Sequence, residues 1–426
     1  MIKDMIGFIN DSPTAFSAVA NIKSILKGKG YKELLENEEF KLKKGGKYYI
    51  ERNGTSLIAF NVGSKLSDPS LHIAASHTDC PSFKLKPNPI IKSDLGIKLN
   101  IETYGGPLSR PWFDRPLSLA GRVMVDGKNG IETVDYLDRK PFCILASMAP
   151  HLNREADNSK LDPAVDMVPI VSLNDKYDFN KYLAKNLKIK ASSILGFDLY
   201  LYPLDKGYVW GDNDEFITCH HIDNLECAYT SLMGFVDAFN DNNINVYASF
   251  DNEEVGSLTR QGADSDFLAN TIERVCKALS LDYHKLVSSG MMLSCDNAHG
   301  IHPNHPEFYD KNNSPKLNGG IVIKYNANQS YTTDSLSSAL LQKLLRKNSI
   351  PYQVFSNKSG IRGGSTLGNI SNGHVSLITV DIGLAQWAMH SPVETCGAYD
   401  VETMINGINC FYLAHLTRKG NIYNLK

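Results

Sequence analysis

The sequence predicts an α/β protein in which helices flank a mixed sheet, with a second, β-rich domain inserted into the chain. In the N-terminal and C-terminal parts, short runs of β-branched and aromatic residues alternate with helical patterns. Between these parts the sequence pattern changes: short β-like runs alternate with turns, as at residues 121–125 before Asp126-Gly127. We therefore expect a main domain formed by residues 1–90 and 213–426, and an inserted domain over residues 91–212.

The first elements predicted are a helix and a hairpin. Ser12-Pro13 indicates a helix start, because a capping hydroxyl precedes a proline at the first helical position. Residues 48–50 and 56–60 are typical of two strands, and Asn53-Gly54 between them favours a tight turn. Residues 71–76 predict the next strand.

The second half of the main domain continues the alternation of strands and helices. Four further strands are predicted at residues 244–250, 291–295, 319–325 and 375–380. Two amphipathic helices are predicted from the spacing of Leu225, Tyr229, Leu232, Val236 and Phe239, and of Met404, Ile408 and Phe411.

Composition excludes several classes of protein. The net charge of −2 over 426 residues is too small to produce a field that would attract nucleic acid or a membrane surface. No apolar stretch reaches the roughly 20 residues that span a bilayer, and the N-terminus lacks the apolar run of a signal peptide. The eight cysteines include no CxxC pair, so we expect reduced thiols and a cytoplasmic location.

The most informative motif is residues 251–257, which directly follows the strand at residues 244–250 and contains the adjacent Glu253 and Glu254. Ligands of open α/β sheets bind where strands end, so two carboxylates at such an end suit a binding or catalytic site. One carboxylate can bind a metal ion while the other accepts a proton from water. The alternative is a solvated acidic loop, which is the commoner meaning of such a motif alone.

Other candidates occupy similar positions, each with an ordinary structural alternative. His77 and Asp79 end one strand and Asp296 ends another, whereas Asp223 precedes a helix and could simply be its N-cap. His390 lies in a loop after the last strand. Two further candidates are Lys324, which is either an anion-binding group or the gatekeeper of an edge strand, and His151, which alone would be a surface turn.

Taken together, these residues suit a pair of hard or borderline divalent ions. Two imidazoles and three carboxylates are available as ligands, and one glutamate remains as a base. Two-metal sites of this kind stabilise both the attacking and the leaving group of a hydrolysis. Because no cysteine belongs to the set, a hydrolytic site fits better than a structural zinc site.

At these residues the chain resembles the aspartyl aminopeptidase (M18) family of metallopeptidases over nearly its whole length. The segments that carry the resemblance are residues 8–16, 76–79, 112–115, 151–154, 251–257, 296–299 and 389–391. The resemblance implies a zinc-aminopeptidase fold whose inserted domain makes dimer contacts in a tetrahedral dodecamer. It also implies a metal-dependent aminopeptidase that takes small peptides, with two divalent ions per subunit, zinc foremost and cobalt or manganese as alternatives.

The resemblance also implies a role for each site residue. Asp223 would bridge the ions, His77 and Asp296 would serve one of them, and Glu254 and His390 the other. Glu253 would be the general base and Asp79 would orient His77. Substrate would be bound by His151, reaching a neighbouring subunit's active site, and by Lys324, near the pocket for the first side chain.

Two questions stay open at the level of sequence. His221-Ile222 stands where many relatives have Arg-Leu, which affects the contacts around the bridging Asp223. A cation at Lys324 favours peptides that begin with Asp or Glu, but a preference for neutral residues, another two-metal amidohydrolase, and a non-catalytic oligomeric scaffold are the alternatives.

Overall fold

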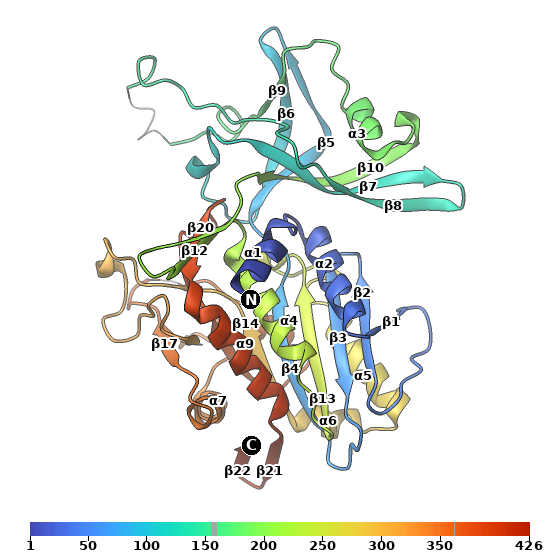
Figure 1. Ribbon diagram of the computed structural model, residues 1–426, viewed down its shortest axis with the longest axis vertical. Coiled ribbons are helices and arrows are strands. Elements are labelled where there is room, and N and C mark those ends of the chain that lie inside the picture. The colour runs from blue at the N-terminus through green and yellow to red at the C-terminus, as the bar shows by residue number, and fades with distance from the viewer. Residues whose placement is uncertain (155–159, 362) are drawn as a thin grey trace. The chain divides into compact units, whose positions relative to one another are not determined.

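The computed structural model describes residues 1–154, 160–361 and 363–426, and the chain divides into two compact units (Figure 1). Unit 1 comprises Met1–Asp79, Gly207–Met389 and Glu394–Lys426. Unit 2 comprises Cys80–Lys206 and His390–Val393. Strand β5 (Ser82–Ser93) belongs to unit 2 because it pairs with β6 and β10 of that unit. The assignment of oligomerisation to the insert stays a prediction.

Unit 1 is built around a mixed sheet of nine strands, which confirms the predicted α/β class. In spatial order the strands are β1 (Lys32–Leu34), β2 (Lys47–Arg52), β3 (Ser56–Val62), β13 (Asn243–Phe250), β4 (Ser70–His77), β14 (Gly290–Cys295), β18 (Ile378–Gly383), β16 (Ile321–Tyr325) and β17 (Tyr352–Ser356). The central strands β13, β4, β14 and β18 run parallel, so their carboxyl ends lie at one edge.

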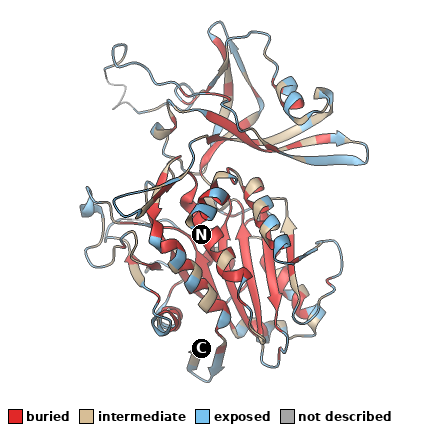
Figure 2. Ribbon diagram, viewed as in Figure 1, coloured by how far each residue is buried: buried red, intermediate tan, exposed pale blue. Residues whose placement is uncertain are grey.

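Helices cover both faces of this sheet. Figure 1 shows α4 (Ile222–Val236) and α9 (Ala398–Leu413) crossing one face, and α5 (Phe267–Leu279) and α6 (Tyr283–Ser288) contribute to the core on the other. Every residue of β4 and β13 is buried, as Figure 2 shows for the centre of the sheet. Because both faces are covered, the polar residues of these strands, such as His72 and Asn245, are buried together with the apolar ones.

The remaining elements of unit 1 surround this core. Its other helices are α1 (Ile2–Asn10), α2 (Ala15–Gly28), α7 (Ser335–Lys347) and α8 (Leu367–Ser371). A five-stranded sheet contains β11 (Tyr208–Trp210), β12 (Phe216–Cys219), β20 (Glu394–Gly397), β19 (Ala385–Trp387) and β15 (Ala298–His299), and a hairpin joins β21 (Leu416–Lys419) to β22 (Ile422–Leu425).

Unit 2 is a six-stranded antiparallel sheet with one α-helix among its described residues, α3 (Phe179–Leu187). Its strands in spatial order are β8 (Gly130–Leu137), β7 (Leu117–Gly127), β10 (Ile194–Pro203), β5, β6 (Gly96–Tyr104) and β9 (Ile170–Ser172). Trp112 is fully buried in its core, with its ring edge against Phe83. In neither unit does any helix of the described chain have the length and apolarity that crossing a membrane requires.

Three predicted boundaries were wrong, each for a local reason. Helix α2 begins at Ala15 rather than Pro13, because Thr14 and Ser17 form a capping box there. Helix α4 ends at Val236, so Phe239 lies outside it and is 39% exposed. Val375 is buried in the core, but its backbone belongs to the turn after α8, and β18 begins only at Ile378.

The end of α9 is fixed to the sheet by buried polar side chains. The Tyr412 hydroxyl accepts a hydrogen bond from Ala74 N of β4 at 3.0 Å and donates to Val246 O of β13 at 2.7 Å. From the strands, His72 Nδ1 and Asn245 Nδ2 donate to carbonyls of the last helical turn at 2.9 and 3.1 Å. These donors satisfy carbonyls that a helix end leaves without intrahelical partners.

We predict that Tyr412→Phe lowers the free energy of unfolding by about 1–3 kcal/mol, because it leaves two buried backbone groups without their partner. The measurement is the shift of the urea midpoint at unchanged slope. Tyr399→Phe is the matched control, since that ring is 51% exposed and its hydroxyl donates to Asn213 O. A control shift of about 0.5 kcal/mol or less is expected, and equal shifts for both variants would contradict the tether.

Candidate metal centre and active site

Polar residues from three parallel strands meet at one edge of the large sheet. Strand β4 ends in His77, β13 runs into the 3-10 helix Glu253–Val255, and β14 runs into Asp296. Phe250, the last residue of β13, pairs with His77, the last residue of β4. The two glutamates follow shortly after Phe250 and so begin near the histidine. The predicted convergence at the carboxyl ends of the strands therefore occurs among these residues.

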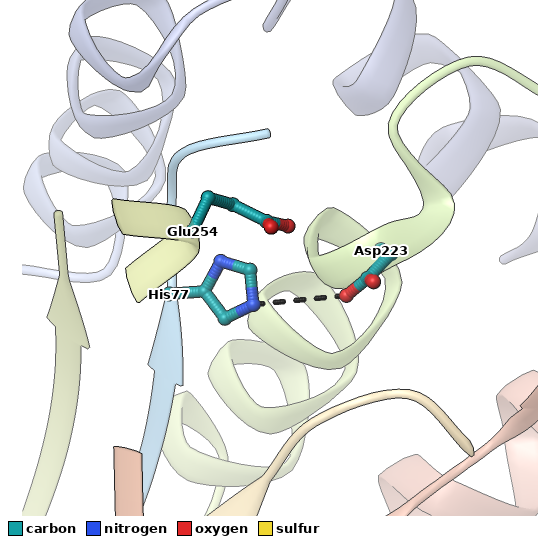
Figure 3. A group of neighbouring side chains, drawn as sticks. All are labelled: His77, Asp223 and Glu254. Carbon is teal, nitrogen blue, oxygen red and sulfur yellow. Dashed lines mark ion pairs between the residues drawn. The ribbon is translucent and has the colours of Figure 1, made fainter. Parts of the chain in front are cut away.

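The centre of the cluster is formed by His77, Asp223 and Glu254, whose ligand atoms all lie within 4.8 Å of one another. Figure 3 shows these three side chains pointing toward one another from β4, the start of α4 and the short helix after β13. Nε2 of His77 lies 3.6 Å from Asp223 Oδ1 and 3.7 Å from Asp296 Oδ1. The same nitrogen of His77 thus faces the carboxylates of both Asp223 and Asp296.

Asp79 connects the histidine with the glutamate segment. Its carboxylate accepts hydrogen bonds from the backbone N–H groups of Glu253 and Glu254, both at 3.1 Å. Oδ1 of Asp79 also lies 3.4 Å from His77 Nδ1, and the backbone oxygen of Asp79 lies 3.0 Å from the same nitrogen. Asp79 therefore holds both the ring and the neighbouring strand end.

Asp223 is not the N-cap that the structural alternative predicted. It lies inside the first turn of α4 with a non-helical backbone, and its N–H donates to Glu394 Oε2 at 3.0 Å. The side chain of Asn224 donates to Cys295 O at 2.8 Å, which joins this turn to the end of β14. Glu394 was missed by the sequence reasoning, and only its position four residues after His390 could have drawn attention to it.

The residues that precede Asp223 are buried as well. His221 has a left-handed backbone with φ of 55°, and its Nδ1 lies 3.1 Å from His220 Nδ1. Burial, followed by the neighbouring imidazole of His220, lowers the pKa of His221 well below its ordinary value. Ile222 is fully buried. His221-Ile222 thus places a neutral ring and an apolar side chain beside the Asp223 turn.

Burial and mutual repulsion dominate the electrostatics of the cluster. Burial raises the pKa of Glu253 to about 8, and burial together with the Asp223 charge raises the pKa of Glu254 well above its ordinary value. Burial lowers the pKa of His77, but the carboxylates of Asp296 and Asp79 outweigh it and leave that pKa well raised. The carboxylates therefore need a positive charge among them.

Lys324 is fully buried and contacts the Asp296 segment. Its Nζ donates to Asp296 O at 2.8 Å and to Asn297 O at 3.2 Å, and lies 3.7 Å from Asp296 Oδ2. Strand β16 lies between β18 and β17, so the alternative of an edge-strand gatekeeper was wrong. Burial alone would lower the pKa of Lys324, but the charge of Asp296 and of other neighbouring groups outweighs burial and leaves that pKa raised. The ammonium therefore stays charged.

The two other predicted histidines belong to unit 2. His390 Nδ1 lies 3.0 Å from Gly106 O of the same unit, and its backbone has φ of 68°. His151 is exposed in the turn that follows Pro150. Their roles as a metal ligand and a substrate contact stay predictions.

The residues present suit divalent cations. The buried Asp223 and Asp296 and the adjoining Glu254 offer oxygen donors around the ring nitrogen of His77, a mixture that zinc, manganese and cobalt accept. Buried carboxylates at this spacing repel one another, and a cation between them would offset the repulsion. The pKa of each glutamate is raised first by burial and then by the charge of neighbouring carboxylates.

Comparison with known proteins agrees with this geometry. The sequence model of the family described as "Aminopeptidase I zinc metalloprotease (M18)" matches residues 8–412. A protein named "Probable M18 family aminopeptidase 2" from Clostridium acetobutylicum is 43% identical, over 93% of this chain and 95% of that protein. A protein of the same name from Ectopseudomonas mendocina is 35% identical, over 97% of this chain and 98% of its own.

Solved structures give the same answer. A chain in the structure of the Ape4 and Nbr1 complex has a TM-score of 0.93 and 31% identity, covering 97% of this chain and 85% of that chain. A chain of the S. cerevisiae mApe1 dodecamer has a TM-score of 0.85 and 28% identity, covering 96% of each. With sequence matches of this extent, the chain belongs to the M18 family of zinc metalloaminopeptidases, hydrolases that act on peptide bonds.

Proposed function

We propose that this aminopeptidase holds two divalent ions around His77 and Asp223 and removes acidic first residues, Asp or Glu, from small peptides. The observation that carries the proposal is the approach of the His77, Asp223 and Glu254 ligand atoms to within 4.8 Å, with Asp296 beside them. Glu253 immediately precedes Glu254, so a further carboxylate is available to move protons.

The proposed ligand set follows the family pattern. Asp223 would bridge the ions, His77 and Asp296 would serve one ion, and Glu254 and His390 would serve the other. When bound, such ions polarise a carbonyl oxygen and lower the pKa of water. Zinc is the ion that the family description names, and cobalt and manganese accept the same donors.

Glu253 is proposed as the general base. It accepts a proton from the attacking water and passes that proton to the amine that leaves. Burial raises the pKa of Glu253, and nearby bound cations would lower it again, which favours the carboxylate that accepts a proton. Asp79 supports this role through its hydrogen bond from the Glu253 N–H, which fixes the backbone of the base.

We predict that Glu253→Gln lowers kcat about 10²- to 10⁴-fold, the usual contribution of a positioned acid–base group, while the bound metal per subunit is unchanged. Initial rates and metal analysis of the same preparation measure the two quantities. Glu273→Gln on the exposed side of α5 is the control, with expected wild-type rates. Normal turnover by the Glu253→Gln variant would remove Glu253 from the mechanism.

The preference for acidic first residues depends on the charge of Lys324. An ammonium has three N–H donors, and two of those of Lys324 are directed at Asp296 O and Asn297 O. The positive charge next to the ligand Asp296 is what would attract a substrate carboxylate. A pocket for neutral side chains is the alternative within the same reaction.

A panel of dipeptides that differ in the first residue tests this preference. We expect cleavage that a chelator abolishes and that zinc, cobalt or manganese restores, with higher kcat/KM for Asp or Glu than for Leu. Higher kcat/KM for Leu or Met would keep the mechanism and reverse the specificity. Hydrolysis of N-acylated amino acids instead would favour an amidohydrolase, and no hydrolysis with any metal would favour a scaffold.

Assembly into a homo-oligomer of twelve chains in the cytoplasm is proposed as well. One structural relative is described as a dodecamer, and the eight cysteines of this chain are all free thiols, as a reducing compartment requires. In this assembly the inserted unit makes the dimer contacts, and the exposed His151 reaches the active site of a neighbouring copy.

We therefore predict a particle of twelve chains by light scattering, and a loss of kcat on the order of 10²-fold for His151→Ala, the cost of removing one transition-state donor. Because the variant keeps the ligand set, its metal content should equal that of the wild type. His284→Ala on the exposed side of α6 is the control. Full activity of a monomeric fraction would contradict a contribution from a neighbouring copy.

A further inference from the structure

Glu226 lies one turn beyond Asp223 in α4 and is completely buried. Its Oε2 accepts a hydrogen bond from Asn297 Nδ2 at 2.7 Å, and the buried thiol of Cys396 in β20 interacts with the same carboxyl group. Asn297 directly follows the candidate ligand Asp296, and its Nδ2 also reaches Leu384 O at 3.4 Å. Glu226 thus connects the segments that carry Asp223 and Asp296.

The hydrogen bonding around Glu226 lacks donors. Among the described residues, Glu226 Oε1, Asn297 Oδ1 and Gln386 Oε1 are buried acceptors without a partner. Gln386 lies opposite Cys396 in the five-stranded sheet. An ionised carboxylate with an unpartnered buried oxygen is strongly unfavourable, whereas a carboxylic acid supplies one O–H donor.

The surroundings also disfavour a negative charge on Glu226. Burial raises its pKa to about 8, and the charges of Asp400 on α9 and Asp223 on α4 act in the same direction. The other titratable groups that face it are the thiols of Cys396 on β20 and Cys227 on α4, both buried, with pKa values raised well above the ordinary value by burial and by Glu226. At neutral pH the uncharged form therefore predominates.

We propose that Glu226 is a positioning residue that, as an uncharged acid, holds the Asp223 and Asp296 segments at the separation that metal binding needs, a role that rests on the proposed metal centre. A carboxylic acid suits this position because it makes directional hydrogen bonds without adding a further negative charge behind the ligands. Groups that orient metal ligands in this way typically contribute 10- to 100-fold to metal affinity.

The experiment compares Glu226→Gln with Glu226→Leu in the full-length protein. The metal is zinc, its dissociation constant is measured by competition with a chromophoric chelator, and thermal unfolding is recorded without metal. The amide of Gln has an acceptor and donors like the acid, so we expect zinc affinity within about threefold of wild type. Leu removes both functions, and we expect zinc affinity about tenfold or more weaker.

Two further variants complete the design. Asp138→Asn is the control, because it replaces an acid of unit 2 whose Oδ1 accepts from Lys140 N, and wild-type zinc affinity is expected. Asn297→Ala removes the other end of the connection, and its zinc affinity should also fall about tenfold, so the test survives if Glu226→Leu does not fold.

Each contrary result has a definite meaning. Wild-type zinc affinity in Glu226→Leu or Asn297→Ala would overturn the positioning role. A loss in Glu226→Gln equal to that in Glu226→Leu would overturn the uncharged state, because a neutral amide can replace a carboxylic acid but not a carboxylate. Failure of the wild-type protein to bind zinc would instead overturn the proposed metal centre, so the two failures are distinguishable.

Discussion

The arrangement of unit 1 depends on the burial of acidic side chains at one edge of the large sheet. Asp79, Asp223 and Asp296 are all buried, and Glu253 and Glu254 lie beside them with raised pKa values. Such charges are tolerated only with hydrogen bonds and positive partners. The parallel strands supply the convergence, the backbone N–H groups satisfy Asp79, and the remaining negative charge matches the divalent ions of the family to which the chain belongs.

Around this cluster, buried polar groups link the segments that bear it. Glu394 accepts from the N–H of Asp223, and Lys324 donates to the carbonyl groups beyond the end of β14. Asn224 and Glu226 approach the same strand end from α4. The segments are therefore held by directional contacts rather than by apolar packing alone, which suits a site that must keep a fixed geometry.

Sequence reasoning predicted the α/β class and the strand ends because both depend on local patterns. His77 and Asp296 directly follow predicted strands and Glu253-Glu254 comes two residues after one, and the sheet brings them together as expected. Sequence reasoning could not identify residues whose role depends on partners that are distant in the chain. Glu394 and Glu226 lack a motif, and the burial of Lys324 in an interior strand depends on the strand order. Helix limits failed where capping or a turn overrode hydrophobic spacing, as at Thr14 and Phe239.

The order of strands in the sheet has a consequence for biosynthesis. Strand β4 pairs only with β13 and β14 among the described strands, and residues 78–242, including most of unit 2, separate it from the first of these partners. On the ribosome, β4 is made long before either neighbour exists, as a strand with two unpaired edges. Such an edge is prone to aggregation. We therefore expect that the unpaired edges of β4 must be shielded from aggregation in the nascent chain, and that chaperones act at this stage of synthesis.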